Sequence, residues 1–410
     1  MKNTYDLAII GGGAAGLSAC AAASRAGDRV VILEGASSIG RKIMASGNGR
    51  CNLMNTGAPR YFGSPSFAQA VLSRCGAGEQ IRFWHSIGLV LAEEEDGRMY
   101  PCTFQAASVL DVLKREIGRR STEVCLNTRI VRCCKTSDGL FLLEADNGSR
   151  ICARRVLVAS GGAAALKTGS AESGYGILKS FGHTVRPLFP ALVPLETDRR
   201  SISGLSGIRV RCTVTLLDRS GSSLHRETGE VLFTDTGVSG ICIMQCARFI
   251  PGAGCCLELD MAGRLFPDDA ALADELRKRM EQYPDSDANT MLVGLVPAKV
   301  SYAVMKQAGI PLRGEKLGEI PQSSILALVH AMRHYRIDIT GTRGMENAQV
   351  TAGGVSCDEF RPDTMESMLV LGLHAAGEIL DVDGDCGGFN LMFAFASGRT
   401  AGRSAGLRRG

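Results

Sequence analysis

Residues 5–16 read YDLAIIGGGAAG, a short apolar run that ends in a glycine-rich turn. Leu7 to Ile10 have the length and composition of a buried parallel strand. Gly11, Gly13 and Gly16 follow in the pattern G-x-G-x-x-G. The first glycine permits a tight turn, the second lets the backbone approach a pyrophosphate, and the third lets a helix pack closely on the strand. The stretch therefore predicts a strand, a phosphate-binding turn and a helix over about residues 14–26, which open a dinucleotide-binding α/β fold.

An acidic residue follows the second predicted strand at the spacing that a nucleotide site requires. Gly27 ends the helix, residues 29–33 form the strand, and Glu34 comes 21 positions after Gly13. A carboxylate here accepts hydrogen bonds from ribose hydroxyls, and an acid in place of a base favours an adenosine with a free 2′-hydroxyl. The pattern indicates FAD or NAD and not NADP. The alternative interpretation is a glycine-rich turn in an ordinary α/β fold.

A second glycine-rich segment, near the other end of the chain, is expected to close over the same nucleotide. Residues 373–398 read LHAAGEILDVDGDCGGFNLMFAFASG. Two further segments border the predicted site: residues 35–55, with the cations Arg41, Lys42 and Arg50, and the SGG turn at 160–162. The cations suit contact with phosphate or flavin, and the SGG turn is a second strand-to-glycine turn of the same lobe. Each segment could instead be an ordinary loop.

Length and charge limit the class of protein. A chain of 410 residues is long enough for two or three lobes. Its net charge of +4 is too small to indicate a nucleic-acid or membrane partner. Asp6 and the glycine turn interrupt what would have to be the apolar part of a signal peptide, and no apolar run has the length of a membrane span. We therefore expect a cytoplasmic enzyme.

The cysteines and histidines give no metal-binding pattern. The fifteen cysteines nowhere form C-x-x-C, which argues against zinc and against a dithiol reductase. We expect most of them to be reduced, buried packing residues. Cys51 and Cys386 lie in the glycine-rich segments that border the predicted cofactor site, but packing is the favoured role for these two as well. His330 and His334 are spaced i, i+4, but the acid of H-E-x-x-H is missing, so we predict a surface pair and no metal site.

The pattern of the chain changes near Pro187 and returns near Gln349. We predict a first part of the cofactor lobe over residues 1–188, an inserted lobe over 189–348 and a second part of the cofactor lobe over 349–410. Alternation in residues 209–217 and 230–233 predicts strands in the insertion, and residues 268–282 and 323–336 predict helices. In the cofactor lobe the expected helices are 66–75, 78–88, 106–120 and one from about Gly388, and the expected strands lie within 122–134, 140–144, 155–159 and 368–371. The basic end of the chain, Arg399, Arg403, Arg408 and Arg409, is expected to be a solvated helix end.

Seven motifs in this order resemble those of the BaiN-like flavoproteins, also known as NAD(P)/FAD-dependent or aminoacetone-oxidase-type oxidoreductases. They are GGGAAG at 11–16, GRKIMASGNGRCNLMN at 40–55, ASGG at 159–162, PALVPL at 190–195, LFTDTGVSG at 232–240, VTAGGV at 350–355 and GEILDVDGDCGGFNLMFAFASG at 377–398. The resemblance implies FAD in a two-part Rossmann-like lobe, with an inserted β-barrel and a helical cap over about residues 250–315. Asn48, Phe393 and Phe395 depart from the family pattern.

The resemblance also implies roles for single residues. Ala14, Ala15 and Glu34 would contact the ADP half, Arg41 and Lys42 the phosphates or flavin, and the backbone at Ile130 the adenine. With the glycines of the turns, the candidate cofactor-binding residues are Gly11, Gly13, Ala14, Ala15, Gly16, Glu34, Arg41, Lys42, Ile130, Gly161, Gly377, Glu378, Asn390 and Leu391.

These patterns predict an FAD-dependent oxidoreductase in which the flavin transfers a hydride. The expected reaction is reduction of a conjugated C=C in an apolar 3-oxo steroid or bile-acid-type molecule. NAD(P)H would dock transiently as donor, because the chain has a single dinucleotide fingerprint. Leu391, Met392, Phe393 and Phe395 suit an apolar ligand site, although they could equally pack the closing helix.

No catalytic residue is identified by the sequence, and the candidates for a proton donor are Tyr100, Tyr175 and Cys386. Two other functions remain open. One is an amine or aminoketone oxidase that uses oxygen, and the other is a non-catalytic, flavin-bearing RNA-binding or redox-sensing protein.

Overall fold

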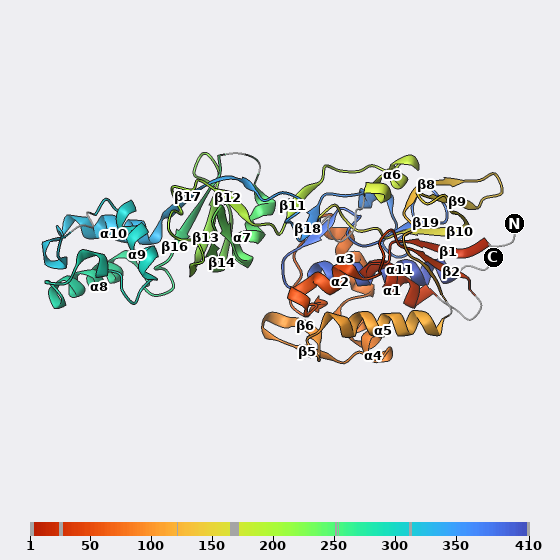
Figure 1. Ribbon diagram of the computed structural model, residues 1–410, viewed down its shortest axis with the longest axis horizontal. Helices are drawn as coiled ribbons and strands as arrows, with labels where there is room; N and C mark the ends of the chain where they lie inside the picture. Colours follow the sequence, from red (N-terminus) through yellow and green to blue (C-terminus); the bar gives the residue numbers. More distant parts are fainter. Residues whose placement is uncertain are drawn as a thin grey trace. The chain divides into compact units, whose positions relative to one another are not determined.

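The computed structural model describes residues 4–23, 28–120, 122–164, 172–250, 252, 254–310 and 314–407. The chain forms two compact units (Figure 1). The first unit contains residues 1–189 and 349–410, and the second contains residues 190–348. Residues 408–410, with two of the four terminal arginines, and Gly27 lie outside the described residues.

A seven-stranded sheet forms the centre of the first unit. Its strands follow the order β7 (Glu123–Cys125), β2 (Val30–Leu33), β1 (Thr4–Ile10), β10 (Arg150–Val158), β9 (Phe141–Ala145) and β8 (Ile130–Lys135). β19 (Leu373–Ala375) pairs in parallel with the end of β10. β7, β2, β1 and β10 are mutually parallel, with Ile10 beside Leu33 on one side and Val158 on the other. The carboxyl ends of these strands therefore lie together at one edge of the sheet, where α/β folds bind nucleotides.

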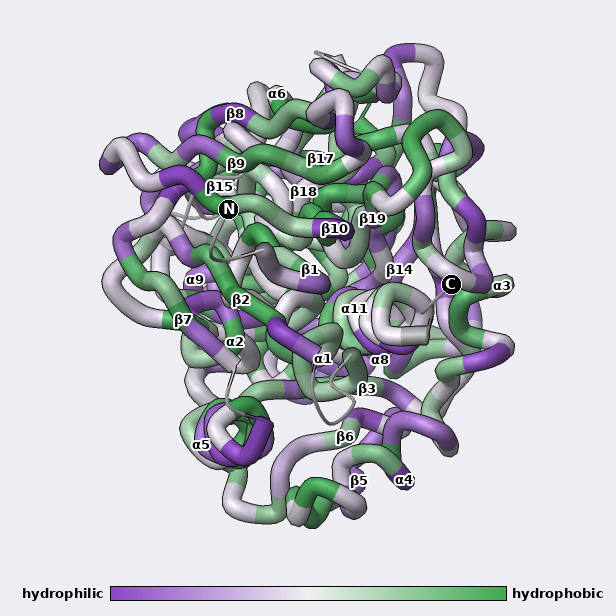
Figure 2. The backbone as a smooth tube through the Cα atoms, turned by 90° about the vertical axis from the view of Figure 1, so that its right-hand side faces the viewer, coloured by the Kyte–Doolittle hydropathy of each residue, from purple (hydrophilic) through white to green (hydrophobic). Residues whose placement is uncertain are grey.

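Helices α1 (Ala14–Ala23) and α11 (Phe389–Leu407) pack against each other, although they come from opposite ends of the chain (Figure 2). Small residues make this close approach possible. A Cβ added to Gly398, Gly402 or Gly406 of α11 would collide with the carbonyl oxygens of Ala15, Ala19 and Ala23 of α1. The contact joins the first and last segments of the chain in one unit.

Smaller elements complete the first unit. Its other helices are α2 (Arg41–Ala45), α3 (Pro65–Arg74), α4 (Ala77–Ser86), α5 (Ala106–Arg119) and α6 (Glu172–Ser180). β3 (Met54–Asn55), β6 (Arg98–Pro101) and β5 (Leu91–Glu93) form one small sheet, and β4 (Tyr61–Gly63) pairs with β20 (Val382–Gly384). β18 (Val350–Ala352) is the remaining short strand of the first unit, and β11 (Phe189–Ala191) spans the boundary at residue 189. The helices predicted near 66–75, 78–88 and 106–120 are thus confirmed to within two residues.

The second unit is a closed barrel with a helical part. The barrel order is β12 (Leu195–Thr197), β15 (Gly237–Ser239), β14 (Ser223–Phe233), β13 (Arg209–Leu217), β16 (Cys256–Asp260) and β17 (Tyr335–Thr342). Alternate residues of β13 are buried, as expected for a strand with one face toward the barrel interior. α7 (Ile241–Cys246) contacts β14, whereas α8 (Asp269–Gln282), α9 (Ala298–Gln307) and α10 (Ser323–Arg333) form the helical part. The helical cap predicted over about residues 250–315 is therefore shifted along the chain. β16 belongs to the barrel, and the helical part extends from α8 through α10.

Three local predictions are wrong. The strand predicted at 368–371 is a turn, and the strand lies at β19 instead. The hydroxyl of Ser367 accepts hydrogen bonds from Leu369 N and Val370 N, which holds the chain out of the sheet until Gly372. The helix predicted to reach residue 336 ends at Arg333, because Tyr335 already pairs in the barrel.

The third error concerns the basic end of the chain. Arg399 is only 2% exposed and pairs with Glu79 at 3.0 Å, so it is not part of a solvated helix end. Its guanidinium also lies over the ring of Phe83. Arg403 joins the same carboxylate, with Nη2 2.7 Å from Glu79 Oε1. The two arginines therefore anchor α11 to α4.

Among the described residues, every helix lacks the length or the apolar character needed to cross a lipid bilayer.

Candidate functional site

The first glycine turn has the geometry that a pyrophosphate requires. Gly11 has φ +108°, and a Cβ there would collide with the carbonyl oxygen of Ala159. A Cβ on Gly16 would collide with Gly11 O, whereas one on Gly13 would meet no atom within 4 Å. The side of Gly13 is therefore open to a ligand. Leu17 N donates to Gly13 O, so the N–H groups of Ala14 and Ala15 come before the first intrahelical bond and can bind an anion at the start of the helix.

Glu34 lies directly beside this turn. Its Oε2 accepts a hydrogen bond from Gly12 N at 2.7 Å, and its Oε1 accepts one from Ala36 N at 2.8 Å. A carboxylate has about four acceptor positions, so two remain for ribose hydroxyls. The backbone just before Ile130 also contacts Glu34, because Thr128 N donates a hydrogen bond to Glu34 O at 2.8 Å. Ile130 itself is buried at the start of β8.

A chain of polar contacts connects α2 with the C-terminal segment. Lys42 Nζ lies 2.9 Å from Glu378 Oε2, and Glu378 Oε1 accepts a hydrogen bond from Thr351 N at 2.9 Å. The hydroxyl of Thr351 accepts one from Ala164 N, just after the SGG turn. Arg41 is exposed at the start of α2. The structure thus brings three predicted residues, Lys42, Gly161 and Glu378, into one region.

Arg50, the third cation predicted in residues 35–55, contacts residues outside the glycine turns. Arg50 Nη2 lies 2.6 Å from Glu94 Oε1, and the guanidinium lies over the rings of Tyr100 and Phe104. Arg50 therefore fixes the small β3–β6–β5 sheet.

The C-terminal segment contacts the first part of the chain at several points. Gly377 lies against α1, because a Cβ there would come within 2.8 Å of Ala15 Cβ. Asn55 Nδ2 donates to Gly387 O at 2.9 Å, and Tyr61 Oη donates to Phe389 O at 2.8 Å. The predicted meeting of the two glycine-rich ends is thus present in the fold.

Asn390 and Leu391 begin α11 next to these contacts. The side-chain amide of Asn390 donates to Gly384 O at 2.8 Å, and its oxygen accepts from Gly384 N at 2.9 Å. Asn390 therefore orders the loop that precedes α11. Leu391 is half-buried.

The three candidate proton donors have different surroundings. Tyr100 lies under the guanidinium of Arg50, with 4.5 Å between the guanidinium carbon and the ring centroid. Burial raises the pKa of the Cys386 thiol, so the thiol stays protonated at neutral pH. Tyr175 is 5% exposed, and its hydroxyl has no hydrogen-bond partner among the described residues. Burial, and then the negative charges of Glu378 and Asp381, raise the pKa of Tyr175.

The apolar residues at the start of α11 mostly belong to the core. Phe395 is fully buried and meets Trp84 edge-on at 4.9 Å between ring centroids. Phe393 is buried beside Tyr61, and the carbonyl of Met392 accepts a hydrogen bond from Gln80. Among the four apolar residues considered for a substrate site, these three pack the helix, and Leu391 alone is half-buried.

The residues of this region fit a bound flavin nucleotide. The hydroxyls of Ser160 and Tyr175 and the amide oxygen of Asn52 are buried atoms without a partner in the described part of the chain. Gly13 and Gly161 leave open space where a Cβ would stand. Ser160, Asn52 and Thr351 lie within the ASGG, GRKIMASGNGRCNLMN and VTAGGV motifs, but the sequence does not predict any of them as a single site residue. A small polar residue beside a glycine turn has no sequence pattern of its own.

The chain matches the family model described as "HI0933-like protein Rossmann domain" over residues 5–404. It is 39% identical to the 3-dehydro-bile acid delta(4,6)-reductase of Clostridium scindens over 98% of this chain and 99% of that protein. It is 31% identical to the ribosomal RNA dihydrouridine synthase of Haemophilus influenzae over 97% of both chains.

Among solved structures, the 3-ketosteroid-delta4-(5alpha)-dehydrogenase of Rhodococcus jostii has a TM-score of 0.51 at 15% identity, over 100% of this chain and 98% of that one, which shows a common fold. The predicted Rossmann-type fold and the predicted family are thereby confirmed. The chain belongs to the HI0933-like Rossmann family.

Proposed function

We propose that this chain is an FAD-dependent oxidoreductase that reduces a C=C bond conjugated to a carbonyl, with NAD(P)H as a transient electron donor. The observation that carries the proposal is the meeting of the two glycine-rich ends in one unit. Gly377 lies against Ala15, and Lys42 pairs with Glu378 beside the SGG turn. A dinucleotide on the α1 turn would therefore have both ends of the chain around it.

Each part of the site would hold a different part of FAD. The α1 turn and its open N–H groups suit the pyrophosphate, and Glu34 suits the adenosine ribose. Lys42 and the start of α11 would lie toward the flavin end. When bound, FAD supplies the hydride of the reaction.

Two names among the relatives support the choice of reaction. A 3-dehydro-bile acid delta(4,6)-reductase acts on double bonds near a 3-oxo group, and a dihydrouridine synthase forms a uracil ring without its C5=C6 double bond. In both substrates the double bond is conjugated to a carbonyl. Hydride addition to such a bond places negative charge on the carbonyl oxygen and leaves one carbon to be protonated.

We place Tyr175 first among the candidate proton donors. Its hydroxyl is buried and has no hydrogen-bond partner within the described residues, so it can bond to a bound substrate. It would donate the proton that completes the reduction.

For the substrate we propose an apolar 3-oxo steroid or bile acid. The support is the 39% identity over nearly the whole of both chains to a bile-acid reductase. The second candidate substrate is a uridine of ribosomal RNA, which the relative at 31% identity favours.

Two assays on the holoprotein separate these functions. In anaerobic stopped-flow spectroscopy of the reduced protein, we expect a 3-oxo-4,6-diene bile acid to reoxidise the flavin rapidly. In air, starting from the oxidised protein, we expect aminoacetone to give little turnover. The opposite ranking would identify an amine oxidase. Reoxidation by unmodified ribosomal RNA, with dihydrouridine formed, would transfer the proposal to RNA. RNA binding in a salt-dependent gel shift without any turnover would indicate a non-catalytic protein.

A further inference from the structure

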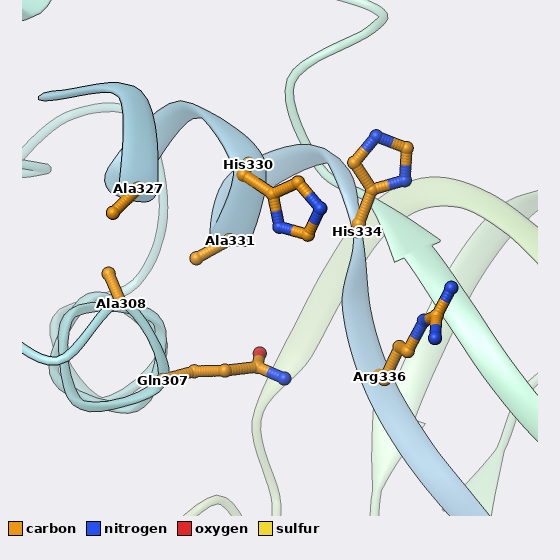
Figure 3. Close-up of a pocket in the computed structure, with 7 residues that line it drawn as sticks. All are labelled: Gln307, Ala308, Ala327, His330, Ala331, His334 and Arg336. Carbon is orange, nitrogen blue, oxygen red and sulfur yellow. The ribbon is translucent and has the colours of Figure 1, made fainter.

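The second unit contains a surface pocket of about 360 Å³ between α9, α10 and β17 (Figure 3). Its polar lining residues are Gln307, His330, His334 and Arg336, and its apolar lining residues are Ala308, Ala327 and Ala331. Among the described residues of the lining, every polar side chain carries N–H groups or a protonatable nitrogen, and none is a carboxylate. Figure 3 shows Ala308 and Ala327 facing each other between the two helices.

A carboxylate outside the lining orients two of these groups. Glu258 Oε1 lies 3.0 Å from His334 Nδ1, and Glu258 Oε2 lies 3.2 Å from Arg336 Nε. Burial opposes the charge of Glu258, but hydrogen bonds from His334 and Arg336 outweigh it and lower the pKa of the carboxyl. Because Glu258 uses only Nε of Arg336, the two Nη groups remain for another acceptor. His334 likewise keeps Nε2 on the other side of its ring.

We propose that this pocket binds the phosphate group of a small molecule. The guanidinium fork of Arg336 matches two phosphate oxygens, and Gln307 and His330 add lining groups from two other elements. Donors from three elements suit an anion with three terminal oxygens better than a carboxylate with two. The alanine side of the pocket leaves room for the organic part of a phosphomonoester.

A metal ion is the competing occupant, because the ring centroids of His330 and His334 are only 4.8 Å apart. Two observations favour the anion. The guanidinium of Arg336 lines the same pocket and would repel a cation. Across the described ranges, no three His, Cys, Asp or Glu residues come together as metal ligands.

Titration calorimetry of the holoprotein tests the proposal with inorganic phosphate and glycerol 3-phosphate as probes. We expect saturable binding at millimolar concentration or below, weakened at least tenfold by Arg336→Gln. Arg277→Gln is the matched control, because Arg277 is also partly exposed and ion-paired but lies outside the pocket lining. Tighter binding of the ester would identify a phosphomonoester site, and tighter binding of inorganic phosphate would identify a site for the free ion.

His330→Gln provides a second test at an exposed residue that is not itself a partner of Glu258. It should also weaken phosphate binding while the thermal unfolding midpoint stays unchanged. Equal phosphate affinity in the wild type and both variants would overturn the proposal. A second result would also overturn the proposal: the wild-type protein binds zinc but no phosphate, and His330→Gln abolishes the zinc binding.

Discussion

Glu34 fixes the backbone of the cofactor turn with both of its oxygens and still has acceptor positions to offer. One oxygen binds Gly12 N and the other binds Ala36 N. Its place after the second strand was visible in the sequence because the spacing from the glycines is set by one helix and one strand. Its bonds to the backbone were not visible, because they depend on how the chain turns after Leu33.

Replacing Glu34 with Ala should weaken FAD binding by about 2 kcal/mol, roughly thirtyfold in Kd, since a charged hydrogen-bond acceptor is lost. Glu93→Ala, at an exposed residue of β5, is the control and should leave the affinity unchanged. Flavin fluorescence during reconstitution measures both affinities. An unchanged Kd for Glu34→Ala would remove this residue from the site.

Two of the three candidate proton donors, Tyr175 and Cys386, give opposite expectations. Tyr175→Phe should slow reoxidation of the reduced flavin by the enone substrate at least tenfold, with FAD still bound, because the buried hydroxyl is lost. Cys386→Ala should leave turnover within about twofold, because the chain has no C-x-x-C motif and burial disfavours the reactive thiolate of Cys386. Single-turnover kinetics measures both rates. Complete loss of turnover in Cys386→Ala, with FAD retained, would establish a catalytic thiol.

At the scale of elements, local patterns identified most helices and strands but not their partners. The glycines at 11, 13 and 16 and the apolar run before them predict β1 and α1 because every cue lies within a few residues. The pairing of α1 with α11 joins residues nearly four hundred positions apart, and no local pattern specifies it. The turn at 368–371 shows the same limit. Its apolar residues suggest a strand, but the hydroxyl of Ser367 binds the backbone that a strand would need.

The α1–α11 contact gives a direct test of close packing. Gly402→Ala should lower the free energy of unfolding by about 2–3 kcal/mol, because its Cβ would collide with Ala19 O of the facing helix. Gly118→Ala in α5 is the matched control. No atom lies within 4 Å of its added Cβ, so the substitution should be neutral or stabilise the protein by up to about 1 kcal/mol. Denaturant unfolding measures both. Equal changes in the free energy of unfolding for the two variants would show that the close contact between α1 and α11 does not contribute to stability.

At the scale of the whole molecule, a buried histidine should make folding sensitive to acid. His374 in β19 is 2% exposed, and burial lowers its pKa to about 4. The unfolded chain takes up this proton near pH 6.5, whereas the folded protein resists it until about pH 4. The stability from neutral His374 is therefore present above pH 6.5 and is lost as the pH falls toward the lowered pKa of the folded protein. Unfolding in urea across this range should show a shallower pH dependence for His374→Gln. The same pH dependence of unfolding in the wild type and in His374→Gln would show that His374 is not the group responsible.

The central claim is that both ends of the chain hold one FAD molecule, and the identity of the released cofactor tests it most directly. The protein should purify yellow, and denaturation should release FAD in a ratio near one per chain, measured by chromatography. FAD is expected because the α1 turn and Glu34 are suited to an adenosine diphosphate group. Release of FMN alone, or of no flavin even after reconstitution with FAD, would contradict the account.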